Sequence, residues 1–235
     1  MKAIFKREFN SYFTSPIGYI FLGCSLIFAG IVFYAANLAV QSPDMSSFFS
    51  MLIYLYIFVT PVLTMRLISD DRRNKTDQLL LTSPVSVTSV VLGKFFAAVA
   101  LLGIFLLILF IYPLILQLYG TIQLGYVINM FVGYLLLGCA LFSIGLFVSS
   151  LTESQVTAAI VTLLVMLFMF FMINVLVNYI GVPFIAKAVS WFAIMNRFTG
   201  FGLGYIDLSS VVYYISITAV FVFLTVQSIE KKRWI

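Results

Sequence analysis

The chain has 235 residues, of which 63% are hydrophobic and only 9% are charged, and its formal net charge is +5. Soluble domains are typically about a quarter charged, so this composition excludes a globular protein surrounded by water. The absence of histidine excludes histidine-based nucleophilic catalysis and zinc-protease motifs, and no metal site is predicted. We therefore expect an all-α membrane protein, because helices satisfy their own backbone hydrogen bonds in lipid.

Residues 1–15 predict a short amphipathic helix that lies in the membrane interface. Lys6, Arg7 and Glu8 fall largely on one side of this helix. The apolar side chains share the other face: Ile4, Phe5, Phe9, Tyr12 and Phe13.

Six apolar segments follow, and each is long enough to cross a bilayer. They cover residues 17–39, 48–67, 95–118, 126–149, 155–179 and 208–228. None of them carries Asp, Glu, Lys or Arg in its interior, as expected for helices that contact lipid. Cys24 and Cys139 lie inside these segments, where we interpret them as small packing residues rather than a disulfide. The whole chain, 1–235, is predicted to form a single transmembrane domain.

The basic residues are distributed asymmetrically in this layout. Only Lys187 and Arg197 fall on one side, and the other side holds Lys2, Lys6, Arg7, Arg66, Arg72, Arg73, Lys75, Lys94, Lys231, Lys232 and Arg233. The positive-inside rule places both termini and the loop 66–94 in the cytoplasm. An even number of spans is required for that arrangement.

Residues 182–206 are apolar but interrupted by Pro183, by charges and by glycines. They predict an interfacial or re-entrant helical element on the outer face, with Lys187, Trp191 and Arg197 as candidate residues of an outer gate. The stretch Gly200–Gly204 lacks the lysine of a phosphate-binding loop, and we interpret it as a flexible turn.

A tight cytoplasmic turn is predicted between the fourth and fifth spans. Thr152 and Gln155 have the spacing of a capping box, which predicts that the fifth helix starts there. Glu153 would then complement the dipole of that helix.

The loop 66–94 is unusually charged, because it holds eight of the chain's 21 charged residues. Its basic residues are explained by topology, whereas acidic residues contribute little to orientation. A leucine run, Leu79–Leu81, follows Asp77 and ends near Pro84. The segment fits a short cytoplasmic helix that docks a soluble partner, and a plain solvated loop is the alternative.

At this loop the sequence resembles the permease subunits of type-2 ATP-binding-cassette exporters, most closely the gliding-motility-associated permeases. The motifs that carry the resemblance are Arg66, Asp70 to Arg73, Lys75 to Asp77, Leu79 to Leu81, Ser83-Pro84, Gly93-Lys94, Ser149 to Gln155, Phe201-Gly202, Tyr205 to Leu208, Tyr213-Tyr214 and Glu230 to Trp234. The sequence departs from the family pattern at Lys75, where glycine is usual, and at Asp77, where glutamate is usual.

The resemblance implies a permease of the prokaryotic cell membrane that works with a second permease copy or a sister chain. Each copy would bind a separate ATPase subunit that carries ATP and Mg, and this chain would hold no cofactor, catalyse no reaction and bind no nucleic acid. The implied coupling residues are Asp70, Asp71, Arg72, Arg73, Lys75, Thr76, Asp77, Leu79, Leu80 and Pro84, with Lys6, Arg7 and Glu8 on the interfacial helix and Thr152, Glu153 and Gln155 in the turn.

Two other functions fit a chain of this composition. One is an ATP-independent secondary carrier, although the spans lack the buried carboxylates that such carriers use. The other is a membrane scaffold or assembly protein. Aromatic and aliphatic spans leave the substrate open among lipids, peptides, drugs and polysaccharide intermediates.

Overall fold

The computed structural model describes residues 1–73, 86–118, 120, 123–172, 175, 193–203 and 207–233. Helix is the only regular secondary structure within these ranges. The elements, in chain order, are α1 Lys2–Thr14, α2 Pro16–Phe33, η1 Tyr34–Leu38, α3 Met45–Leu52, α4 Leu55–Thr64, α5 Ser69–Arg73, α7 Val87–Leu109, α8 Ile111–Leu116, α9 Leu124–Leu151, α10 Gln155–Leu167, η2 Phe168–Met172, η3 Ile194–Leu203 and α13 Leu208–Arg233.

Four of the described helices are long and apolar enough to cross a membrane: Pro16–Leu38, Val87–Leu116, Leu124–Leu151 and Leu208–Lys231. A fifth is obtained when α3 and the helix Leu55–Asp71, which bend by 45°, are counted as one span. The predicted span 155–179 appears as a shorter apolar helix, Gln155–Phe171, and most of its remaining residues lie outside the described ranges. The helical multi-pass architecture is thus confirmed, and the sixth span stays a prediction.

Proline explains why the third span is divided into α7 and α8. Pro113 lies in the first turn of α8, where its missing N–H is not needed. Its ring would clash with the carbonyl of Leu109, four residues earlier, and α7 ends at that residue.

The helix α9 forms the centre of the bundle. It packs against α4, α7, α10 and α13. In an 18-residue apolar stretch of this helix, 72% is buried inside the protein. Two glycines allow the close approach, because a Cβ on Gly138 would overlap Tyr56 and a Cβ on Gly145 would overlap Thr64. Backbones can meet this closely only where the side chain is missing.

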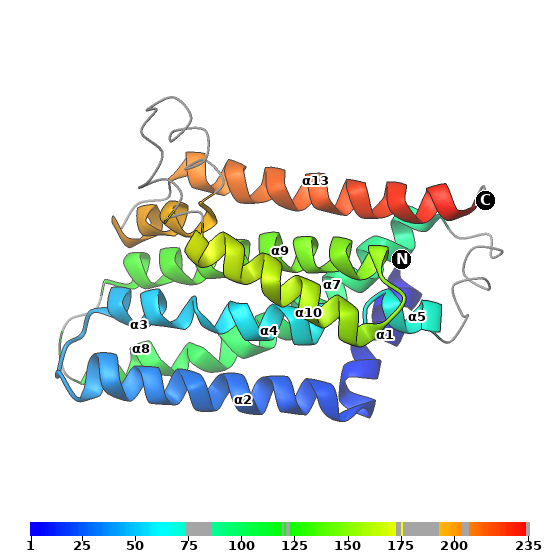
Figure 1. Ribbon diagram of the computed structural model, residues 1–235. Coiled ribbons are helices and arrows are strands. Elements are labelled where there is room, and N and C mark those ends of the chain that lie inside the picture. The colour runs from blue at the N-terminus through cyan, green and yellow to red at the C-terminus, as the bar shows by residue number, and fades with distance from the viewer. Residues whose placement is uncertain are drawn as a thin grey trace, which may run out of the picture.

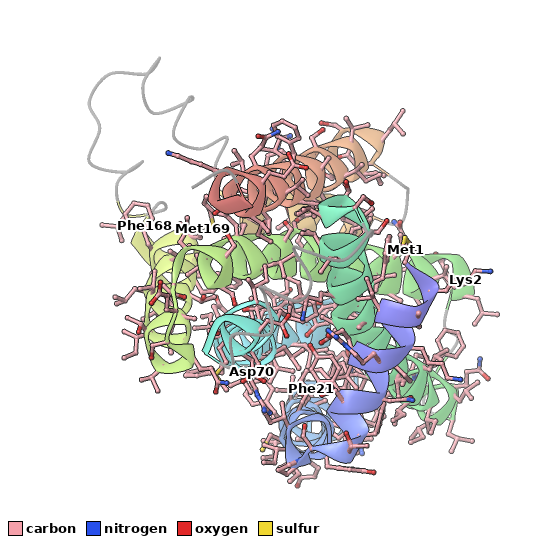
Figure 2. The ribbon with its side chains drawn as sticks, turned by 90° about the vertical axis from the view of Figure 1, so that its right-hand side faces the viewer. Met1, Lys2, Phe21, Asp70, Phe168 and Met169 are labelled. Atoms are coloured by element: carbon pink, nitrogen blue, oxygen red, sulfur yellow. The ribbon has the colours of Figure 1, made fainter. Side chains whose placement is uncertain are left out.

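Both chain ends and α5 lie at one end of the bundle, which we call the charged end (Figure 1). The helices α2, α9 and α13 run lengthwise, whereas α1 lies across the charged end (Figures 1 and 2). The predicted N-terminal helix is therefore present as α1, and its place in the membrane interface stays a prediction. Its apolar residues pack on the protein, with Tyr12 buried and Phe5, Phe9 and Phe13 forming a chain of ring contacts.

At the opposite end, the prediction of a flexible glycine-rich turn is wrong. Gly200 to Leu203 belong to the 3-10 helix η3. Phe201 within it is fully buried, and its carbonyl accepts a hydrogen bond from Asn129 at 3.1 Å. Burial of this aromatic side chain explains why the segment forms a regular helix. Its glycine content alone does not indicate such a helix.

Candidate functional site

The site at the charged end begins with the contact between α1 and α7. A Cβ built on Gly93 would lie 3.0 Å from Cγ2 of Ile4 and 3.4 Å from the backbone nitrogen of Phe5. Such distances are closer than ordinary van der Waals contact. Gly93 therefore lets α1 rest directly on α7.

The next residue, Lys94, connects three helices. Its Nζ lies 3.1 Å from Oε1 of Glu8 on α1 and 2.7 Å from Oδ2 of Asp71 on α5. Lys94 is only 3% exposed. Burial of a charge is costly unless it is paired and hydrogen-bonded, and the two carboxylates meet that need. We call Lys94, Glu8 and Asp71 the lysine node.

The start of α7 explains why a lysine can be buried here. The sequence predicts a span from residue 95, with Lys94 as the last residue of the cytoplasmic loop 66–94. In the structure α7 begins earlier, at Val87, where Ser86 caps it by accepting a bond from the Ser89 amide. The helix Val87–Leu116 has 30 residues and is about 45 Å long, against roughly 30 Å of bilayer hydrocarbon. Lys94 thus lies inside the helix but near its end, where α1 and α5 cover it.

The helix α5 is also tied to α10. Oδ1 of Asp70 accepts a hydrogen bond of 2.5 Å from Nε2 of Gln155, the first residue of α10. The other oxygen of Asp70 lies 3.5 Å from a guanidinium nitrogen of Arg66. Asp70 and Asp71, which are adjacent, therefore hold different helices.

Ser149, near the end of α9, binds the turn that leads into α5. Its hydroxyl oxygen lies 3.3 Å from the amide nitrogen of Ile68 and 3.2 Å from that of Ser69, and it accepts from both. These amides sit at the start of a helix, where backbone donors lack intrahelical partners. Together with the lysine node and Gln155, Ser149 joins α5 to four other helices.

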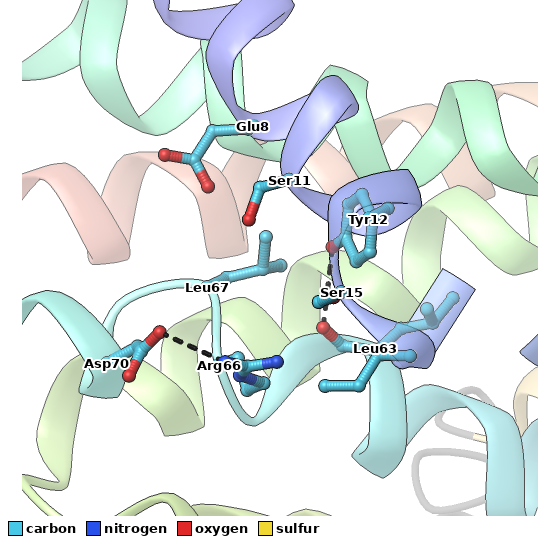
Figure 3. A pocket seen from close by; sticks show the side chains of 9 residues that line it. Glu8, Ser11, Tyr12, Ser15, Leu63, Arg66, Leu67 and Asp70 are labelled. Atoms are coloured by element: carbon cyan, nitrogen blue, oxygen red, sulfur yellow. Dashed lines mark hydrogen bonds and ion pairs between the residues drawn. The ribbon is translucent and has the colours of Figure 1, made fainter. Parts of the chain in front are cut away.

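A small pocket of about 40 Å³ lies between α1 and the α4–α5 connection (Figure 3). Glu8, Ser11, Tyr12, Arg66 and Asp70 are among its lining residues. The hydroxyl of Tyr12 donates a 3.5 Å hydrogen bond to the carbonyl of Leu63, and burial raises the pKa of the Tyr12 phenol well above its usual range. The volume is suited to water rather than to a substrate.

The other coupling residues predicted from the sequence are only partly placed. Lys6 and Arg7 are exposed on α1, and Arg7 pairs with Glu8 at 2.6 Å. For Arg72 and Arg73 the structure describes the helical backbone of α5. The remaining coupling residues lie outside the described ranges: Lys75, Thr76, Asp77, Leu79, Leu80 and Pro84.

The capping box predicted in the turn after α9 is wrong. Thr152 is the C-terminal cap residue of α9, and its hydroxyl donates to the carbonyl of Val148 at 3.4 Å. Ser154 is the N-cap of α10, and Gln155 is its first residue, so Glu153 precedes the cap. The Gln155 side chain is used for the bond to Asp70, which a local spacing rule cannot detect.

On the opposite end, Arg197 belongs to η3 and lies 5.5 Å from the ring centre of Tyr213 on α13. Its carbonyl oxygen lies 3.1 Å from the Ser210 hydroxyl, whose single proton is directed mainly to the closer Asp207 carboxylate at 2.6 Å. Lys187 and Trp191, which were predicted to share this element, lie outside the described residues.

Lys94 and Ser149 were not among the candidate site residues predicted from the sequence. Both occur in motifs that carry the family resemblance, Gly93-Lys94 and Ser149 to Gln155. Those motifs are the feature of the sequence that could have identified them as site residues. Their partners are distant in the chain, so only the fold reveals their contacts.

A family model described as ABC-2 family transporter protein matches residues 3–231. The chain belongs to the ABC-2 transporter family. A search of curated proteins gave no match. Because the match covers α1 through α13, the α1–α5–α7 site lies inside an ABC-2 permease domain, and this family in general associates with an ABC ATPase subunit.

Proposed function

We propose that this ABC-2 permease is the membrane subunit of an ATP-driven exporter, and that its charged end faces the cytoplasm and receives a separate ATPase. The observation that carries the proposal is the lysine node, in which the buried Lys94 joins α1, α5 and α7. Two members of the node, Asp71 and Lys94, flank residues 74–85 in the sequence, which are the part of the predicted coupling loop between α5 and α7. The resemblance to gliding-motility-associated permeases supports export as the direction.

The contacts at the charged end supply a mechanical route in this proposal. Movement of α5 by a docked ATPase would pull α7 and α1 through Lys94, α10 through Gln155 and α9 through Ser149. ATP and Mg would be bound by the partner, and two permease copies would form the translocation path. This chain would then change conformation without catalysing a reaction.

The route assigns Asp70 and Asp71 to contacts inside the permease. Asp71 pairs with Lys94, and Asp70 pairs with Arg66 and Gln155. Lys6 and Arg7 of α1 are exposed to the surface, and Arg7 stays exposed although it pairs with Glu8, so both side chains can contact the ATPase. Binding of the ATPase and transmission of its movement to the spans are thus assigned to different residues of the charged end.

The test is co-purification of the tagged chain from its host membrane, followed by hydrolysis assays of any ATPase that carries a phosphate loop. We expect such an ATPase to be retained, and its rate of hydrolysis to differ between the free and permease-bound forms. Lys94→Met, assayed below its own midpoint of thermal unfolding, should retain the ATPase but abolish that difference in rate, because the route through the node is broken. Lys231→Met, an exposed lysine of α13, is the matched control and should behave as the wild type.

The outcomes separate the alternative functions. If no ATPase is retained and the purified chain alone transports along an ion gradient, it is a secondary carrier. If it retains partners but nucleotide changes neither its conformation nor the rate of hydrolysis, it is a scaffold. If Lys94→Met retains the full rate difference, the permease assignment stands and the route through the node is wrong.

A further inference from the structure

A continuous apolar track runs along the outside of α7, away from the lysine node. Two hollows, each of about 440 Å³, adjoin on this helix and share Ala100 in their linings. The first lies between α1 and α7 and is lined by Met1, Lys2, Phe5, Phe96, Val99 and Ala100. The second lies between α7 and α9 and includes Gly103, Leu107, Phe110, Ile128 and Val132.

The spacing of the α7 residues explains why the track is continuous. Phe96, Ala100, Gly103, Leu107 and Phe110 are separated by four, three, four and three residues, which places them on one face of a helix. A Cβ built on Gly103 would meet no atom within 4 Å. The small residues Ala100 and Gly103 therefore form the floor of the track, and larger side chains form its ends.

The dimensions and depth of the track suit one lipid acyl chain. From Phe96 to Phe110 the helix rises about 21 Å, against roughly 15 Å for the hydrocarbon of one leaflet. The helix belongs to the most apolar of the described spans, with a mean hydropathy of 2.9. Its lining between Val99 and Phe110 contains no charged residue.

The end of the track beside α1, which we call its mouth, carries positive charge. Lys2 lines this mouth, and Lys6 lies one turn farther along α1. The acidic residue of α1, Glu8, is engaged by Arg7 and Lys94. Figure 2 shows Met1 and Lys2 at the rim of the charged end, beside α7. A lysine above an apolar groove at the membrane interface is complementary to a negatively charged headgroup joined to a hydrocarbon chain.

We propose that this track is a binding site for an anionic phospholipid, with its phosphate beside Lys2 and one acyl chain along Ala100, Gly103 and Leu107. Such a lipid would fill the space between α1, α7 and α9 and so support the seat of α1 on α7. The proposal does not depend on an ATPase partner, and its test needs none.

The experiment is native mass spectrometry of the purified full chain in micelles that contain equal amounts of phosphatidylglycerol and phosphatidylcholine. We expect phosphatidylglycerol to be retained about fivefold over phosphatidylcholine, as one well-placed lysine gives. Lys2→Glu should remove the preference. Lys231→Glu should leave it intact, because Lys231 is an exposed lysine in the last turn of α13, the helix whose C-terminal end reaches the charged end in Figure 1. Equal retention of both lipids by the wild type would overturn the proposal, as would loss of the preference in both variants.

A second pair of variants tests the apolar part of the site without changing charge. Gly103→Leu should fill the track and reduce retention of both lipids to the level of a detergent background. Gly23→Leu is the control, because a Cβ there also meets nothing within 4 Å but lies on α2. Undiminished retention in Gly103→Leu overturns the proposal. If Gly103→Leu instead changes the oligomeric mass while lipid retention is unaltered, the occupant is a second copy of the chain and the lipid assignment is wrong.

Discussion

The Nζ atom of Lys94 lies 2.7 Å from Oδ2 of Asp71, and the two side chains are only 4% and 19% exposed. The pair joins the second turn of α7 to the short helix α5. Because Glu8 contacts the same ammonium group at 3.1 Å, removal of the lysine would leave two neighbouring carboxylates without their shared cation. The position of α5 thus depends on a residue of a different span.

Lys94→Met is expected to destabilise the chain strongly. Removal of one partner of a buried ion pair typically costs about 3–5 kcal/mol, because the remaining charge is uncompensated. The measurement is the midpoint of thermal unfolding in detergent, which should fall well below that of the wild type. Lys231→Met is the control, and an equal midpoint for both variants would show that the lysine node is not structural. Asp71→Asn should fall between them, since Glu8 still pairs with Lys94.

Gly93→Leu is expected to lift α1 from α7. The new side chain would enter the space that Ile4 and the Phe5 backbone occupy, and overpacking of this kind costs about 1–3 kcal/mol. Hydrogen exchange of the α1 amides should become faster than in the wild type. Gly23→Leu introduces the same side chain at an open position of α2, so it should leave α1 exchange close to that of the wild type. Slow exchange in both variants would contradict the close contact.

Ser149→Ala is expected to loosen the turn between α4 and α5. The substitution leaves the amides of Ile68 and Ser69 without their acceptor, and an unsatisfied buried donor costs about 1–3 kcal/mol. Ser150→Ala is the matched control, because the Ser150 hydroxyl donates only to Phe147 of its own helix in the bonds described. Hydrogen exchange at residues 66–71 should rise in Ser149→Ala and not in Ser150→Ala. Equal effects would mean that Ser149 acts through helix packing alone.

Asp207, at the start of α13, should give a pH-dependent contribution to stability. The Ser210 hydroxyl donates to its carboxylate at 2.6 Å and the Ser209 amide donates at 3.1 Å, and the pKa of Asp207 is lowered below 3.8, mainly by the Ser210 bond. A carboxylate with a lowered pKa in the folded state stabilises above its unfolded pKa, and this stabilisation is lost as the pH falls through the folded value. Thermal midpoints of the wild type and Asp207→Asn should therefore differ at neutral pH and converge below pH 3.8. A difference that is constant with pH would exclude the charge as its cause.

The positions of the helices could be predicted from the sequence because they depend on local properties. The apolar segments 17–39, 126–149 and 208–228 coincide with α2 to η1, α9 and α13, since backbone satisfaction in lipid admits helices of that length. The amphipathic pattern of residues 1–15 likewise identified α1. The breaks within the spans could not be predicted in this way. The 45° bend between α3 and α4, for example, depends on how the second span packs against its neighbours.

The sequence indicated which segments contain the residues of the candidate site, but not which residues contact one another. Asp70, Asp71, Glu8 and Gln155 were identified as candidates, yet their interpretation as residues for an external partner missed the bonds that they make within the chain. The capping box at Thr152 failed for the same reason, because sequence spacing cannot show that Gln155 reaches a different helix.

The sequence by itself determined that this chain is a helical membrane protein with its positive charge at one end, because hydropathy and charge act along the chain without reference to distant residues. Only the tertiary structure decided which charges are shared inside the protein. The pairing of Lys94 with Glu8 and Asp71 requires α1 to cross α7 at Gly93 and α5 to return against the same face. That approach brings one positive and two negative charges into a largely buried space, where their attraction is strong enough to fix how the helices meet.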